Sequence, residues 1–160
     1  MKLDTLKRIL SVFSNPYSHF SIRYVAQQAK MHYTSCYLAV EEMIEEGIIV
    51  RINVGNSFNI GLNLDNERVM SYISLMSIDR RDEFLKKNPK YHDYMNHYRK
   101  RCHFLIFMDG LVIVSDEKHD TSITLAEFER MLLKPKYKEK ALKATVLLYP
   151  EMFWRTVMGR

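Results

Sequence analysis

The chain has 160 residues, a length that suits one domain of average size or two small ones. Hydrophobic residues make up 47% of it and charged residues 27%, which excludes a disordered protein because the apolar surface suffices for a core. Five glycines and four prolines exclude low-complexity and fibrous classes. The formal net charge of +5 permits an anionic partner without requiring one.

The charge is unevenly distributed along the chain. Residues 1–65 contain six basic and six acidic side chains, so the positive excess lies in residues 66–160. The neutral part is itself divided, because residues 1–38 are basic and residues 39–65 are acidic.

Cysteine usage and hydropathy bear on the compartment. Cys36 and Cys102 both fall in segments with the pattern of regular structure and define no disulfide framework, which predicts a reduced, cytoplasmic protein. The first fifteen residues mix Asp4 and several basic residues with apolar ones, unlike a signal peptide. No apolar run approaches membrane-spanning length, so we expect no membrane partner.

Three helices and a hairpin are predicted for the N-terminal part. Apolar residues recur at helical spacing over residues 3–13, 22–29 and 33–46. Ser21 is suited to cap the second helix, and Gly47 to end the third in a left-handed conformation. The apolar period then changes to two, with a turn at Val54-Gly55-Asn56-Ser57, which predicts a β-hairpin.

Residues 20–62 also carry a pattern of packing positions within these elements. The positions are Ile22, Val25, Ala26 and Ala29 in the second helix, Met31 in the turn, Cys36, Val40 and Met43 in the third helix, and Gly47-Ile48-Ile49 before the hairpin. This pattern resembles the winged helix-turn-helix regulators of bacteria and archaea. The resemblance implies that the third helix is a recognition helix and that the hairpin is a wing.

The resemblance implies a site for double-stranded DNA, with the N-terminal half of the third helix in the major groove. Its polar and aromatic side chains could contact phosphates and base edges, while the second helix and the wing would meet the backbone. The expected DNA-binding residues are Arg23, Gln27, Lys30, His32, Tyr33, Thr34, Ser35, Tyr37, Arg51, Asn53 and Asn56.

The third helix also carries a feature that argues against strong DNA binding. It contains no Arg or Lys, and its end is acidic through Glu41, Glu42, Glu45 and Glu46. Phosphate contacts dominate the affinity for DNA, so this domain alone should bind weakly. The expected phosphate-neutralising cations are Lys7, Arg8, Arg23 and Lys30 around the motif and Arg51 on the wing, with the Arg80/Arg81 and Lys134–Lys143 segments of a second copy as further candidates. Many winged helices serve as protein-interaction modules, and that alternative stays open.

The C-terminal part predicts a mixture of helices and strands. Helices are expected over residues 66–87 and 91–98, followed by a buried hairpin, Phe104–Phe107 with Leu111–Val114, around Asp109-Gly110. After a polar loop at 115–122, Thr124 and Glu127 form a capping box at the start of a helix. A basic helix over 136–143, a strand over 146–149 and a terminal helix from Pro150 complete the chain.

Several of these C-terminal segments resemble archaeal chains in which a winged helix precedes a small nucleotidyltransferase domain. The matching segments are Leu62–Asn66, Arg80–Lys87, Ile123–Glu129 and Val146–Tyr149 with Phe153-Trp154-Arg155. That family holds Mg²⁺ and a nucleotide with a Gly-Ser turn and an Asp-x-Asp pair. Here Met108-Asp109-Gly110 stands in that place, which implies a catalytically inactive remnant without a cofactor.

Two other groups of residues are weak candidates for chemistry. His92, His97, Cys102 and His103 cluster in sequence, but their spacing does not direct them to one metal position. Ser115, Asp116, His119 and Asp120 include the residue types of a hydrolase triad, but they lie in one polar loop without a nucleophile elbow. We therefore predict neither a metal site nor a catalytic site.

Together these patterns predict an α+β protein. Residues 1–64 form a winged helix of three helices plus a hairpin, residues 65–88 a helical connector, and residues 89–160 a small α/β domain. The predicted function is DNA-binding transcriptional regulation, as a homodimer, because residues 66–87 carry more apolar positions than one flank can bury. The alternative is a non-catalytic protein-interaction module, either antitoxin-like or a scaffold relic of a nucleotidyltransferase.

Overall fold

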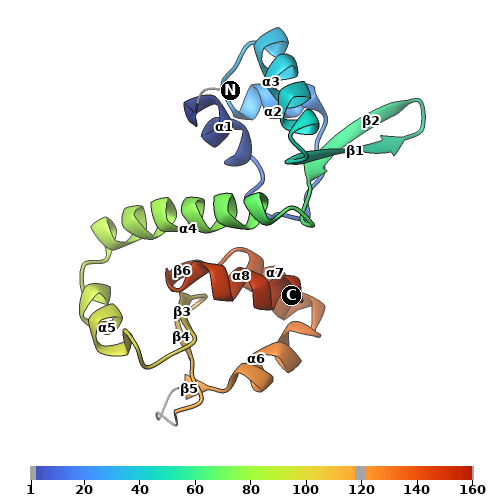
Figure 1. The fold of residues 1–160 in the computed structure, drawn as a ribbon. Coiled ribbons are helices and arrows are strands. Elements are labelled where there is room, and N and C mark those ends of the chain that lie inside the picture. Colours follow the sequence, from blue (N-terminus) through green and yellow to red (C-terminus); the bar gives the residue numbers. More distant parts are fainter. Residues whose placement is uncertain (1–2, 118–121, 160) are drawn as a thin grey trace. The chain divides into compact units, whose positions relative to one another are not determined.

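The computed structural model describes residues 3–117 and 122–159 and has the predicted α+β architecture (Figure 1). The chain forms two compact units, Met1–Tyr72 and Ile73–Arg160, and the long helix α4, Glu67–Lys87, contributes to both. Within the described ranges, none of the helices combines the length and the hydrophobicity needed to span a bilayer.

The first unit contains three helices followed by a hairpin, in the predicted order. Its elements are α1, Leu3–Leu10; α2, Ile22–Gln28; α3, Tyr33–Glu45; β1, Ile49–Val54; and β2, Ser57–Leu62. The predicted cap of α2 is confirmed, because the Ser21 hydroxyl accepts a hydrogen bond from the Tyr24 N–H at 3.3 Å. The predicted end of α3 is also confirmed, since Gly47 has φ +70.

Helix α1 is shorter than the predicted span of residues 3–13. After Leu10 the backbone tightens, so that the Val12 N–H bonds the Ile9 carbonyl at 3.2 Å and the Phe13 N–H bonds the Leu10 carbonyl at 3.0 Å. These bonds reach back three residues rather than four and end the α-helix. Phe13 nevertheless stays buried in the core, as its place in the apolar pattern predicts.

The core of the first unit lies beneath α3, which contacts α1, α2 and β1. Cys36, Val40 and Met43 are fully buried on the inner face of α3 and Ala39 is nearly so, as the helical spacing predicts. Burying a side chain of valine or methionine size contributes roughly 1.5–3 kcal/mol, so this face fixes the rotation of α3 about its own axis.

The hairpin pairs Ile49 with Leu62 and closes where Val54 pairs with Ser57, at the predicted turn. A third segment joins it, because Phe20 and Ile60 exchange backbone hydrogen bonds of 3.0 and 2.8 Å. This bridge was not predicted, since a single paired residue leaves no alternating pattern in the sequence.

The second unit is built on a mixed four-stranded sheet with the strand order β5-β4-β3-β6. Strand β3 is antiparallel to both β4 and β6, and β4 is parallel to β5. Its elements after α4 are α5, Tyr91–Tyr98; β3, Phe104–Phe107; β4, Leu111–Val114; β5, Ser122–Ile123; α6, Leu125–Leu132; α7, Pro135–Leu142; β6, Thr145–Leu148; and α8, Pro150–Met158.

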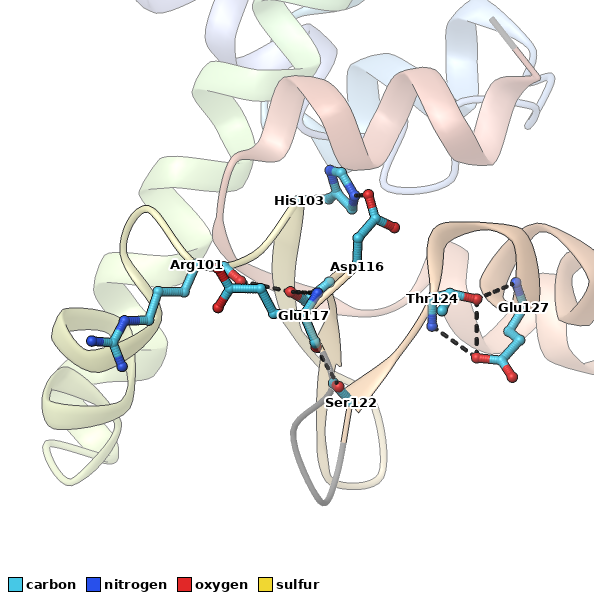
Figure 2. Close-up of polar contacts among 8 residues, drawn as sticks. Arg101, His103, Asp116, Glu117, Ser122, Thr124 and Glu127 are labelled. Atoms are coloured by element: carbon cyan, nitrogen blue, oxygen red, sulfur yellow. Dashed lines mark hydrogen bonds and ion pairs between the residues drawn. The ribbon is translucent and has the colours of Figure 1, made fainter.

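Strand β5 is not evident in the sequence, because its two residues are too few for a period and Ser122 continues the polar stretch 115–122. Side-chain hydrogen bonds support this edge of the sheet (Figure 2). The Ser115 hydroxyl donates to the Arg101 carbonyl at 2.6 Å and accepts from the Glu117 N–H at 3.1 Å. The Ser122 hydroxyl donates to the Glu117 carbonyl at 3.1 Å and thereby joins β5 to the segment that follows β4.

The capping box at the start of α6 is confirmed (Figure 2). The Glu127 N–H donates to the Thr124 hydroxyl oxygen at 3.2 Å, and the Thr124 N–H donates to the Glu127 carboxylate at 2.8 Å. Both bonds satisfy N–H groups that the first turn of a helix leaves unpaired.

A buried hydrogen bond joins α4 to α8 within the second unit. The Trp154 indole Nε1–H donates to the Ser77 hydroxyl oxygen at 2.7 Å, and this hydroxyl donates to the Ile73 carbonyl at 2.9 Å. Trp154 is 1% exposed and packs edge-on against Phe153, with ring centroids 5.0 Å apart. In the folded protein the Ser77 hydroxyl therefore replaces water as the hydrogen-bond acceptor of the buried indole N–H.

We expect Ser77→Ala to lower the free energy of unfolding of the second unit by about 1–3 kcal/mol, because the buried indole N–H loses its acceptor. Ser74→Ala is the matched control: the Ser74 hydroxyl oxygen on the same helix is buried and has no hydrogen-bond partner within the described chain. Urea denaturation followed by the emission of Trp154, the single tryptophan, measures both. Equal losses in the two variants would contradict the assigned role of Ser77.

Candidate nucleic-acid interface

The predicted DNA-binding side chains lie on the exposed faces of α2, α3, the turn between them and the hairpin. Every one of them is exposed: Arg23, Gln27, Lys30, His32, Tyr33, Thr34, Ser35, Tyr37, Arg51, Asn53 and Asn56. The structure thus leaves the whole predicted set accessible to a partner. It also shows why, since the opposite face of α3 is held in the core.

The N-terminal half of α3 presents polar and aromatic groups. Tyr33, Thr34 and Ser35 form the first turn, and His32 precedes it as an N-cap whose side chain makes no capping hydrogen bond. The N–H groups of this turn carry partial positive charge, which favours a nearby anion such as a phosphate. The rings of Tyr33 and Tyr37 lie 6.2 Å apart, centroid to centroid, so they form one aromatic patch.

Two exposed cations of α2 and the following turn have no ion pair to any described residue. Arg23 lies on the exposed face of α2, and Lys30 lies in the turn that joins α2 to α3. Their charges are therefore available to neutralise phosphates of a bound duplex.

Two other cations that the sequence offered for phosphate contact are engaged within the first unit. Arg51 on β1 pairs with Glu41 of α3 and lies over the Phe58 ring at 5.1 Å. Arg8 donates to the Ala29 carbonyl at 2.6 and 3.0 Å and also to the Lys30 carbonyl, so it caps the C-terminal end of α2. The paired residues lie 10 and 21 positions apart in the chain, so no local sequence pattern predicts these contacts.

The same surface carries exposed apolar groups. Leu38 on α3 is 64% exposed, and Tyr33 is 52% exposed. Tyr24 on α2 was missed by the sequence argument, although it is exposed and its ring stacks on Phe20 with centroids 4.8 Å apart. Such groups suit thymine methyls in a major groove, and equally an apolar patch on a protein.

The candidate remnant of a nucleotidyltransferase site lies at the β3–β4 turn. Asp109 has φ +57 there, and its carboxylate accepts a hydrogen bond from Lys140 Nζ at 2.6 Å. This hydrogen bond and the charge of Asp109 raise the pKa of Lys140. Asp109 thus has a structural partner on α7.

Some of the residues considered for metal or hydrolase chemistry come together in the fold, because Cys102, His103, Ser115 and Asp116 line one small pocket. His103 Nε2 lies 2.8 Å from a carboxylate oxygen of Asp116 (Figure 2), whereas the Ser115 hydroxyl bonds the backbone instead. His119 and Asp120 lie outside the described residues. Across residues 3–117 and 122–159, no three His, Cys, Asp or Glu side chains gather as a metal site.

No protein-family model, curated protein or solved structure matches this chain. The exposed surface of α2, α3 and the hairpin, and the chemistry of its side chains, are therefore the features of this chain that point to a function.

We expect Lys30→Gly to stabilise the first unit by up to about 1 kcal/mol. Lys30 has φ +53, a left-handed conformation that costs about 1–2 kcal/mol for a residue with a Cβ, and the greater flexibility of glycine in the unfolded chain offsets part of this gain. Lys30→Ala removes the same charge but keeps the Cβ, so it should give no such gain. Calorimetric unfolding compares the two variants. Equal stabilisation by both would mean that loss of the charge, and not relief of backbone strain, stabilises the first unit.

Proposed function

We propose that this chain is a DNA-binding transcription regulator that reads duplex DNA with α3 in the manner of a winged helix, as a homodimer. The observation that carries the proposal is the outward face of α3. Its N-terminal half combines exposed Tyr33, Thr34, Ser35 and Tyr37 with a first turn that has no side-chain cap, and α2 and the turn before α3 add the exposed cations Arg23 and Lys30. The proposal assigns no catalytic step, metal or cofactor.

The division of labour on this surface follows from charge. Arg23 and Lys30 contact phosphates and supply affinity without regard to sequence, because every phosphate carries the same charge. Tyr33 and Ser35 contact base edges and supply specificity, because donors and acceptors differ between base pairs. Because Arg23 and Lys30 are the cations that this surface offers in each copy, one half-site binds weakly, and two copies on adjacent half-sites double these phosphate contacts.

A second candidate function is a protein-interaction module, and the exposure of Leu38 at 64% favours it. The pairing of Arg51 with Glu41 favours it too, since it removes a cation from the hairpin. An exposed leucine beside tyrosines resembles the apolar centre of a protein–protein contact. Binding to DNA at low salt discriminates between the two functions.

We expect Arg23→Ala and Lys30→Ala each to weaken binding to all duplexes alike and to reduce the slope of log K against log salt by roughly 0.9. Ser35→Ala and Tyr33→Phe should instead cost about 1–3 kcal/mol on a selected duplex only and leave the slope unchanged. Fluorescence anisotropy with a selected and a scrambled duplex, at several salt concentrations, separates these effects.

Glu41→Gln provides a control with the opposite sign. It removes one negative charge and releases Arg51, so affinity for both duplexes should rise and the salt slope should steepen by about 0.9. If the full chain ignores duplex DNA even at low salt, or none of these variants changes affinity, the DNA-binding proposal fails and the protein-interaction module takes its place.

We expect the full chain to be a dimer in solution at micromolar concentration, since the proposed mode of binding uses two copies of α3. Multi-angle light scattering measures the mass, and the chain mass of 19.1 kDa sets the scale. A mass that stays at one chain across that concentration range, without DNA and with it, would contradict the homodimer.

A further inference from the structure

A cavity of about 740 Å³ opens in the second unit, outside the candidate interface. Residues from α4, the segment before β3 and the start of α8 line it, and most of its wall is apolar. The lining includes Ile78, Cys102, His103, Tyr149, Met152 and Arg155. Sites for small molecules in proteins have volumes of about 300–1,000 Å³ and mostly apolar walls with few polar groups, so this cavity has the dimensions of such a site.

The ionisable side chains of the wall, Arg155, Glu151 and His103, have partners within the second unit. Arg155 pairs with Glu151 at 3.2 Å within α8, and His103 lies 2.8 Å from the carboxylate of Asp116 (Figure 2). Burial raises the pKa of the Cys102 thiol to about 11, so this group is neutral at physiological pH. A charged ligand would lose its hydration here without gaining an unengaged counter-charge, and a neutral ligand loses little.

Two hydroxyl groups of the wall have unused hydrogen-bonding capacity: Ser74, whose oxygen has no partner within the described chain, and Tyr149. The Tyr149 hydroxyl oxygen accepts from the Lys100 N–H at 3.1 Å, while its own hydrogen has no acceptor among the described residues. Both residues are left-handed, Tyr149 with φ +54 and Lys100 with φ +72, although neither is glycine. Residues in such strained backbone conformations are common at ligand sites, and they persist only where the surrounding structure holds them in place.

We infer that this cavity binds a neutral, mostly apolar small molecule of the size of a fused-ring aromatic compound, with one acceptor for the Tyr149 hydroxyl. The apolar wall supplies the affinity, the paired charges exclude anions and cations, and Tyr149 orients the ligand. This inference goes beyond the DNA-binding proposal and does not depend on it, since no residue is shared between the two sites.

The test uses the full chain and 6-propionyl-2-dimethylaminonaphthalene, a neutral fluorophore whose ketone is an acceptor. Its emission and the quenching of Trp154, which lies on α8 beside the lining residues, report binding independently. We expect saturable binding of one fluorophore per chain. The anionic 1-anilinonaphthalene-8-sulfonate should bind at least about tenfold more weakly, because its sulfonate has no unengaged partner in the wall.

Three variants locate the binding. Met152→Glu places a charge in the wall at a residue that is 45% exposed, so the fold tolerates it and affinity for the ketone falls at least about tenfold. Leu133→Glu is the matched control, since Leu133 is 81% exposed in the same unit and does not line the cavity. Tyr149→Phe removes the hydrogen-bond donor, so it should lower the affinity for the ketone fluorophore and shift the emission of the bound fluorophore to the blue. N-phenyl-1-naphthylamine lacks a carbonyl, so this variant should bind it with unchanged affinity.

Other results overturn the inference. Absence of saturable binding of both neutral fluorophores would do so, as would equal or tighter binding of the sulfonate. Equal losses in Met152→Glu and Leu133→Glu would place the fluorophore elsewhere on the surface. If Met152→Glu converts a dimer to monomers and neither neutral fluorophore saturates, the cavity is a contact between two copies of the chain and not a ligand site.

Discussion

Burial of the inner face of α3 is the constraint on which the first unit depends. Cys36, Val40 and Met43 lose all contact with water there, and α1, α2 and β1 pack around them. A helix held along one face has no rotational freedom, so the positions between these residues must face outward. The exposure of Tyr33, Ser35 and Tyr37 is therefore a consequence of core packing, and the proposed DNA contacts use a surface that the core defines.

Ion pairing then determines how basic that surface is. Counted along the sequence, residues 1–38 are basic, but in the folded unit Arg8 is occupied by the carbonyls at the end of α2, and Arg51 is occupied by Glu41. Arg23 on α2 and Lys30 in the turn before α3 have no ion pair to a described residue. If the chain binds DNA as proposed, these contacts of Arg8 and Arg51 limit its affinity for phosphate, and the aromatic patch on α3 supplies its specificity.

In the second unit, too, contacts between side chains determine which groups a ligand can reach. The hydrogen bond from Trp154 to Ser77 joins α8 to α4, and the segment before β3 completes the wall of the cavity. The ionisable side chains of that wall have partners nearby, so the cavity offers a ligand no unengaged counter-charge. A strained Tyr149 contributes its one remaining hydrogen-bond donor.

The sequence by itself determined the order of the helices and hairpins, and the inner face of α3. Spacing, the capping box at Thr124, Gly47 and Pro150 are local signals, and local signals are legible in a single chain. Only the tertiary structure decided the Phe20–Ile60 bridge, strand β5, the Arg51–Glu41 pair and the cavity. Each of these features is formed by residues that are distant in the sequence. Contacts between distant residues depend on tertiary packing, which the local spacing of residues does not predict.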